Sequence, residues 1–211
     1  DLRMSMAHAL GRQLGRPAGL AGRLVGRLMP VLNARPTRLA IEALEIGSGD
    51  AALDIGFGAG DGVALLARRA TRVCGIDHSP LMLERALRRN RMAVREGRVD
   101  LRLGDFAALP WPDASFDAIL AANVVYFWRE PERVVAELRR VLRPGGRLAI
   151  YATAAETMRS WAFAGPETHR HVVAAELMPM LVEGGFTPQR ITIRALALPA
   201  GVAGLLALAR L

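Results

Sequence analysis

The middle of the chain changes repeatedly from short apolar runs to amphipathic segments of helical period. Apolar runs of this length predict strands, and the amphipathic segments between them predict helices. The predicted strands cover residues 51–56, 72–76, 99–103, 116–122 and 147–152, and the predicted helices cover residues 61–69, 80–89 and 131–141. Strands that alternate with helices are typical of a parallel sheet with helices on both faces. We therefore expect an α/β, doubly wound fold.

The last forty residues predict one more helix and two more strands. The helix lies near residues 172–183 and stops at Gly184-Gly185, a pair suited to a left-handed helix end. The apolar segments 190–198 and 201–211 are expected as a final strand pair, which brings the sheet to seven strands.

The first forty residues follow a different pattern. Leucines recur there at helical spacing with arginines between them, and Pro17 and Pro30 interrupt the pattern. This predicts a basic, amphipathic extension of short helices at residues 1–45, followed by one domain at residues 46–211. Such an extension suits either a lid over a binding site or contact with a membrane interface.

A glycine-rich turn follows the first predicted strand. After Asp54, the glycines Gly56, Gly58 and Gly60 stand at alternate positions before a helix begins. Glycine removes the Cβ that would keep a ligand away from the backbone, and a helix start presents free N–H groups. The spacing differs from a dinucleotide fingerprint, because Asp61 stands where that fingerprint needs its third glycine. Carboxylates at this turn disfavour a pyrophosphate.

Further polar residues follow the later strands. Asp77 ends the second strand about twenty residues after the glycines, the separation at which a doubly wound fold delivers a carboxylate to a ribose diol. Asp105 follows the third strand, and Asn123 follows the fourth. In order and spacing these segments resemble the motifs of class I S-adenosylmethionine (SAM) methyltransferases. The wider resemblance is to the ubiquinone/menaquinone-biosynthesis type, methyltransferase type 11.

The resemblance implies a mostly parallel, Rossmann-like sheet of seven strands, with the last two as an antiparallel hairpin at its edge, and SAM as the cofactor. It also implies that Asp77 binds the ribose, that Asp105 accepts from the adenine amino group and that Phe106 borders the ring. The implied cofactor-binding residues are Asp54, Gly56, Gly58, Gly60, Asp77, His78, Met82, Gly104, Asp105, Phe106 and Asn123.

Candidates for the acceptor side follow the fourth and fifth strands. The segment 126–128, Tyr-Phe-Trp, suits either a wall of an acceptor pocket or a wedge between a loop and a helix. His169 and His171 fall where the family places substrate-facing loops, and imidazole titrates near working pH; an exposed loop explains them equally well. We take His169, His171 and Tyr126 as the candidate catalytic residues. Since no cluster of acids or cysteines accompanies the histidines, no metal site is expected.

Composition narrows the class of protein. The 211 residues are 52% hydrophobic and carry a net charge of +8 that comes from arginine alone. No aromatic-interleaved basic stretch accompanies the scattered arginines, so we interpret most of them as solvated helix faces. The single cysteine, Cys74, lies in a predicted buried strand, which favours a reduced, cytoplasmic setting. With neither a membrane-spanning run nor a signal-peptide pattern, a soluble protein is expected.

These observations predict an enzyme that transfers a methyl group from SAM to a small, largely apolar acceptor. The stretch from Gly11 also resembles bacterial phospholipid N-methyltransferase-like relatives, so a membrane-associated lipid N-methyltransferase with peripheral membrane contact is the alternative. A nucleic-acid methyltransferase ranks lower, because segment 123–126 reads Asn-Val-Val-Tyr where base-nitrogen methyltransferases carry Asn/Asp-Pro-Pro-aromatic. A non-catalytic SAM-binding module also ranks lower, since the cofactor motifs are intact. The acceptor, the methylated atom and homodimer formation stay open.

Overall fold

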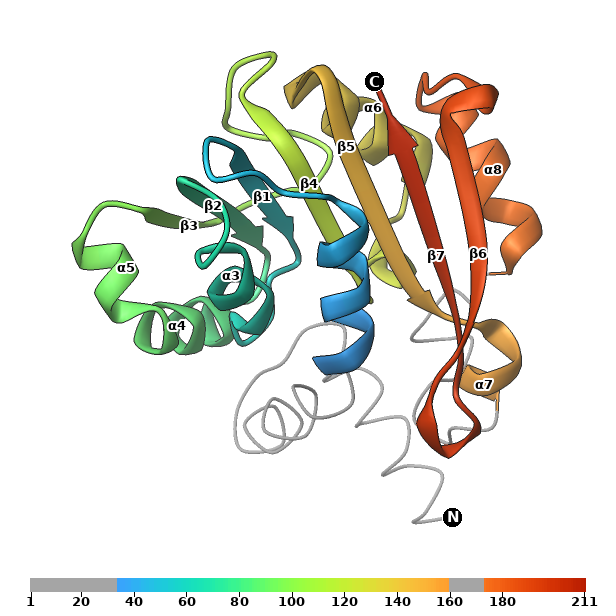
Figure 1. Cartoon of the computed structure of the whole chain (residues 1–211), viewed down its shortest axis with the longest axis horizontal. Helices are drawn as coiled ribbons and strands as arrows, with labels where there is room; N and C mark the ends of the chain where they lie inside the picture. Colours follow the sequence, from blue (N-terminus) through green and yellow to red (C-terminus); the bar gives the residue numbers. More distant parts are fainter. Residues whose placement is uncertain (1–33, 160–172) are drawn as a thin grey trace.

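The computed structural model describes residues 34–159 and 173–211, and its centre is a seven-stranded sheet (Figure 1). The strand order is β3-β2-β1-β4-β5-β7-β6. The strands from β3 to β5 run parallel to one another, and β7 runs antiparallel to both β5 and β6. The predicted α/β, doubly wound, mostly parallel sheet is therefore confirmed, with the last strand pair as an antiparallel hairpin at its edge.

The elements follow the predicted order. The strands are β1 (Ala51–Ile55), β2 (Arg72–Asp77), β3 (Val99–Leu103), β4 (Phe116–Ala122), β5 (Leu142–Thr153), β6 (Ile191–Ala197) and β7 (Ala203–Arg210). The helices are one over residues 34–43, α3 (Asp61–Leu66), α4 (Pro80–Arg89), α5 (Arg91–Arg95), α6 (Pro131–Val141), α7 (Ala155–Arg159) and α8 (Ala174–Glu183). Short 3-10 turns are η1 (Val125–Phe127), η2 (Pro188–Arg190) and η3 (Pro199–Gly201). The short helices α5 and α7 are not predicted by the sequence pattern.

The largest difference from the predicted boundaries is at the start of β5. The strand expected at 147–152 begins already at Leu142, which pairs with Phe116. The next paired residue, Arg147, lies opposite Ala118, so the residues between the two pairs bulge out of the ladder. The residues just before the expected strand therefore form a bulge within β5.

Two apolar layers cover the two faces of the sheet. The helix over 34–43, α3 and α4 pack on one face, and α6 and α8 pack on the other (Figure 1). Because successive strand residues point to opposite faces, Leu53 of β1 joins the layer with α6, whereas Ala52 joins the layer with α3. The same alternation directs Asp54 toward α3. Cys74 is buried in the layer with α6, as predicted.

The carboxyl ends of the parallel strands meet at one edge of the sheet. The chain order reverses between β1 and β4, because β2 and β3 lie on one side of this pair and β5 on the other. Ligands of open α/β sheets bind at such a switch point. In the register, Ile55 of β1 lies level with Ile76 of β2 and Ala121 of β4, so the loops that follow these three strands converge there.

Some sequence predictions fall outside the described residues. Of the extension and lid expected at residues 1–45, the structure describes only the part from residue 34 onward, which begins as the helix over 34–43. The candidate catalytic residues His169 and His171 also lie outside the described residues.

Candidate functional site

The turn between β1 and α3 is built of residues in the left-handed backbone region. Gly56, Gly58 and Gly60 have φ angles of +68°, +52° and +85°, a conformation that costs other residues about 1–2 kcal/mol. A Cβ at Gly56 would lie 2.3 Å from Cγ2 of Val124, and one at Gly60 would lie 2.9 Å from the Cα of Ala86. Gly56 and Gly60 are therefore required for packing within the protein itself.

Gly58 differs from the other two, because a Cβ built there meets no atom of the described residues within 4 Å. Its N–H donates a 2.9 Å hydrogen bond to Oδ2 of Asp77. The described residues leave room for a ligand to lie directly against the Gly58 backbone. Of the three turn glycines, Gly58 is the one whose Cβ position no described residue occupies.

Asp77 ends β2 beside this turn and is buried. Oδ2 accepts from Gly58, and Oδ1 accepts from the N–H of Ser79 at 2.9 Å. Burial raises the pKa of the Asp77 carboxyl, while the backbone hydrogen bonds and the charge of His78 oppose that rise. A carboxylate offers about four acceptor positions, so Asp77 retains capacity for the two hydroxyls of a diol.

Asp54 lies in β1 and is only 3% exposed. Gly62 of α3 makes room for it, since a Cβ at Gly62 would lie 2.4 Å from Oδ2 of Asp54. Burial, and then the charges of Asp77 and Asp61, raise the pKa of the Asp54 carboxyl well above its usual range. Within residues 34–159 and 173–211, no group donates a hydrogen bond to its side chain. A buried carboxyl group that accepts no hydrogen bond favours a cationic partner.

The glycine turn is therefore surrounded by carboxyl groups. Asp61, in the first turn of α3, forms an ion pair with Arg89, whereas Asp54 and Asp77 have no described cation as an ion-pair partner. Two carboxyl groups in a partly desolvated site attract a ligand with a cationic centre and repel a phosphate. This geometry supports the prediction that the turn does not serve a dinucleotide.

The ends of β2 and β3 form the side of the site expected to hold the adenine. The rings of His78 and Phe106 meet edge to face with centroids 5.7 Å apart, and Phe106 and Met82 are buried. The N–H of Gly104 donates to the carbonyl of Asp77 at 3.0 Å, which joins the two strand ends. Asp105 is exposed, and its Oδ1 accepts from the N–H of Ala107 at 2.9 Å.

Asn123 and Tyr126 lie together after β4. Asn123 has a left-handed backbone, with φ of +54°, and its Oδ1 accepts from the Tyr126 hydroxyl at 2.7 Å and from the Thr153 N–H at 3.1 Å. The Tyr126 hydroxyl also accepts from the Thr153 N–H. Burial raises the pKa of Tyr126, so its hydroxyl stays protonated at neutral pH. The network ties the carboxyl ends of β4 and β5 together.

The aromatic side chains of the segment 126–128 are mostly internal. Tyr126 and Trp128 are buried in the apolar layer with α6, and half-buried Phe127 packs against that layer, its ring edge to face with Tyr126 at 6.1 Å. These contacts fit the interpretation that Tyr126 and Trp128 pack between a loop and a helix, and not the interpretation that they form a wall of an acceptor pocket.

Three residues of the site are missed by sequence reasoning. Gly62 makes room for Asp54, the Ser79 N–H donates to Asp77, and Thr153 joins the Asn123 network. A glycine inside a helical pattern is a usable signal for Gly62. The role of Thr153 depends on contacts between strands, for which the local sequence carries no signal.

Within the described ranges, no group of three or more His, Cys, Asp or Glu side chains is placed to hold a metal ion. Among the same residues, no helix has both the length and the apolar character needed to cross a bilayer.

Comparison with known proteins finds a family model and several curated relatives. Residues 53–150 match the family model described as a methyltransferase domain. Over 115 residues, 54% of this chain and 46% of the relative, the chain is 40% identical to demethylmenaquinone methyltransferase of Tropheryma whipplei. Over 102 residues, 48% of this chain and 50% of the relative, it is 39% identical to phosphatidylethanolamine N-methyltransferase of Cereibacter sphaeroides. Residues 53–150 thus resemble a SAM-dependent methyltransferase domain.

The similarity to solved structures concerns the fold alone. The crystal structure of the [4+2]-cyclase SpnF superposes with a TM-score of 0.71 at 23% identity, over 83% of this chain and 80% of that one. The chain spans between 32% and 51% of the length of the curated relatives that it matches.

Proposed function

We propose that the protein transfers a methyl group from SAM to a small, largely apolar acceptor. The observation that carries the proposal is the pair of buried carboxyl groups, Asp54 and Asp77, at the glycine turn, where Asp77 accepts from the N–H of Gly58. SAM carries a ribose diol, an ammonium group and a sulfonium group. The diol suits Asp77, and a cationic group suits Asp54.

When bound, SAM supplies an activated methyl group for in-line displacement, so the chain contributes mainly alignment and exclusion of water. In the proposal, Asp77 orients the donor, Gly58 lets it lie against the backbone, and His78, Met82 and Phe106 border its ring. Gly104 and Asp105 complete the adenine side of the site. The oxygen of Asp105 that does not accept from the Ala107 N–H is offered to the adenine amino group.

A base is needed only when the acceptor atom carries a proton that must leave. Because the Tyr126 hydroxyl is protonated and bonded to Asn123, Tyr126 enters the proposal as a positioning residue that holds the loop after β4. His169 and His171 remain our candidates for the base.

The names of the relatives support a small acceptor, since one acts on demethylmenaquinone. A lipid acceptor is the second candidate, because another relative is named a phosphatidylethanolamine N-methyltransferase. Methyl transfer from radiolabelled SAM to quinone-like and aminophospholipid acceptors, offered separately, distinguishes the two. Label in neither class would contradict the acceptor proposal while leaving SAM binding to be measured by itself.

We further propose a cytoplasmic location, from the single buried Cys74, and a lid role for the extension at residues 1–45. Peripheral membrane contact and a homodimer are also compatible with this proposal.

A further inference from the structure

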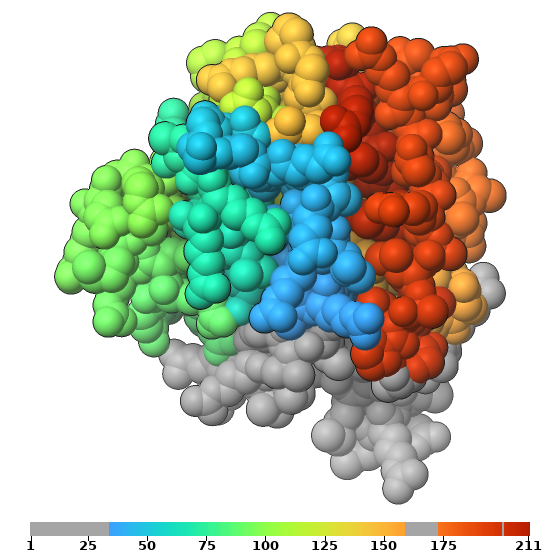
Figure 2. Space-filling view, viewed as in Figure 1, coloured from blue at the N-terminus to red at the C-terminus, as the bar shows by residue number. Residues whose placement is uncertain are grey.

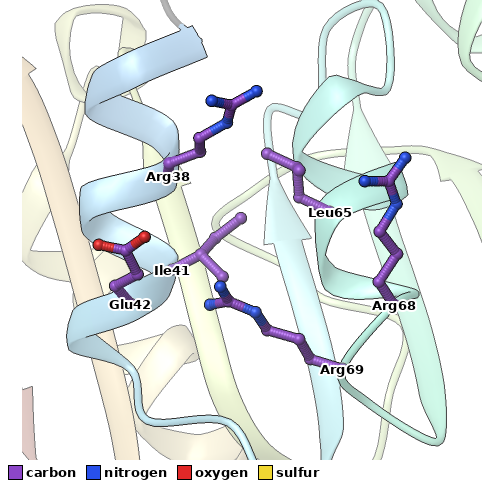
Figure 3. Close-up of a pocket in the computed structure, with 6 residues that line it drawn as sticks. All are labelled: Arg38, Ile41, Glu42, Leu65, Arg68 and Arg69. Atoms are coloured by element: carbon purple, nitrogen blue, oxygen red, sulfur yellow. The ribbon is translucent and has the colours of Figure 1, made fainter.

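A second cavity lies away from the glycine turn, between the helix over 34–43 and the far end of α3. It has a volume of about 150 Å³. Figure 2 shows the two helices side by side on one face of the molecule. The lining residues, drawn in Figure 3, are Arg38, Ile41, Glu42, Leu65, Arg68 and Arg69. We call this cavity the arginine groove.

The groove is strongly cationic. Three of its six lining residues are arginines and one is a glutamate, which leaves a net charge of +2 (three minus one). Within residues 34–159 and 173–211, nine arginines form ion pairs with carboxylates, and Arg38, Arg68 and Arg69 are among those that form none. Like charges beside one small cavity repel one another, and an anion bound between Arg38 and Arg69 would lower that repulsion.

The shape of the groove combines this charge with an apolar floor. In Figure 3 the side chains of Arg38 and Arg69 reach into the space between the helices, whereas the Glu42 carboxylate lies on the other side of its helix. Ile41 is buried below them, and Leu65 lines the opposite wall. Guanidinium groups bind phosphate oxygens through paired N–H donors, and an apolar stem can lie on the floor.

Residues 1–33 add five arginines and a single acidic residue, Asp1, to the charge of the chain. An anion from outside the chain is a fitting occupant of the groove. The volume corresponds to about five water molecules, which is enough for a phosphate group.

We propose that the arginine groove binds a phosphate group carried on an apolar stem, the chemistry shared by an anionic phospholipid headgroup and a soluble phosphate monoester. The site is separate from the carboxyl-lined SAM site, whose charge is of the opposite sign. The proposal therefore stands independently of methyl transfer.

The test uses the full chain and calorimetric titration with two probes, short-chain phosphatidic acid below its micelle concentration and inorganic phosphate. The variant is the triple substitution Arg38→Gln, Arg68→Gln and Arg69→Gln. The matched control removes three exposed arginines outside the groove, Arg91→Gln, Arg95→Gln and Arg194→Gln, and thus lowers the net charge equally. Binding of S-adenosylhomocysteine to each protein serves as the check on folding.

We expect phosphatidic acid to bind the unmodified chain, the groove variant to lose about tenfold or more in affinity, and the control to lose less than about threefold. Much weaker binding of inorganic phosphate identifies a stem-bearing lipid headgroup as the ligand, whereas equally tight binding identifies a free phosphate and overturns the apolar stem. Absence of binding by both probes would overturn the proposal, as would equal losses in the two triple variants. Preferential binding of a single-stranded RNA oligonucleotide over phosphatidic acid would overturn it as well.

Discussion

The backbone N–H of Gly58 donates a 2.9 Å hydrogen bond to Oδ2 of Asp77, although nineteen residues separate them in the chain. This bond joins the turn after β1 to the end of β2 and sets the distance between the open backbone and the carboxyl group. Because Gly58 has open space in front of it and its neighbours do not, the turn glycines differ in what a substitution disturbs.

Gly58→Val should remove SAM binding while the protein stays folded. The new Cβ meets no described residue within 4 Å, so the expected cost to stability is the left-handed strain of about 1–2 kcal/mol. Gly60→Val is the informative comparison, because its Cβ would strike Ala86 and lower the melting temperature much further. Calorimetry and thermal unfolding of both variants check this. Normal SAM affinity in folded Gly58→Val would show that the turn is only a connector.

Asp54→Asn should stabilise the protein without ligand at alkaline pH but weaken its SAM binding. The folded pKa of Asp54 is raised above its unfolded value near 3.8, so the folded state binds more protons between the two values. Stability therefore falls as pH rises through that window, and the ionised carboxylate stays unfavourable above it.

The measurement is the melting temperature of wild type and Asp54→Asn from about pH 4 to pH 8, where about 2–4 °C corresponds to 1 kcal/mol. Wild type should lose stability relative to the variant as the pH increases. Glu183→Gln, at an exposed position, is the control, and its melting temperature should follow that of wild type across this range. Parallel curves for wild type and Asp54→Asn would refute the assignment of a costly buried charge.

Tyr126→Phe should lower stability by about 1–3 kcal/mol, because it removes the bond to Asn123 and one acceptor of the Thr153 N–H. A positioning role predicts that the pH profile of methyl transfer keeps its shape. The opposite result would be an unchanged free energy of unfolding, a rate of methyl transfer lower by about a hundredfold or more, and the loss of one ionisation from its pH profile. That result would identify Tyr126 as the base.

Deletion of residues 1–27 should leave SAM affinity unchanged and remove methyl transfer to the native acceptor. The reason is that every proposed SAM contact lies at or beyond Asp54, whereas the extension is proposed to cover the acceptor. Calorimetry with SAM and turnover with the acceptor measure the two effects separately. Unaltered turnover in the truncated protein would rule out the lid.

The sequence predicts the elements best where local signals and tertiary packing agree. Helix α4 starts at Pro80 after the cap residue Ser79, and both signals are visible in the sequence. The start of β5 is missed, because its bulge depends on pairing with Phe116 and with Ala118, which are distant in the chain. The sequence does identify Asp54, Asp77 and Asp105 as candidate site residues, because each lies at or near the end of a predicted strand. The separate roles of Gly56, Gly58 and Gly60 depend on neighbours such as Val124 and Ala86, which only the fold supplies.

The most direct test of the account is calorimetric titration of the unmodified chain and of Asp77→Ala with S-adenosylhomocysteine, SAM and NAD. The account predicts binding of the first two at one site and a loss of about tenfold or more in Asp77→Ala, the size expected for a charged hydrogen-bond acceptor. Glu183→Ala, an exposed acid at the end of α8, should bind like the unmodified chain. Unchanged affinity in Asp77→Ala, or binding of NAD in place of SAM, would contradict the account.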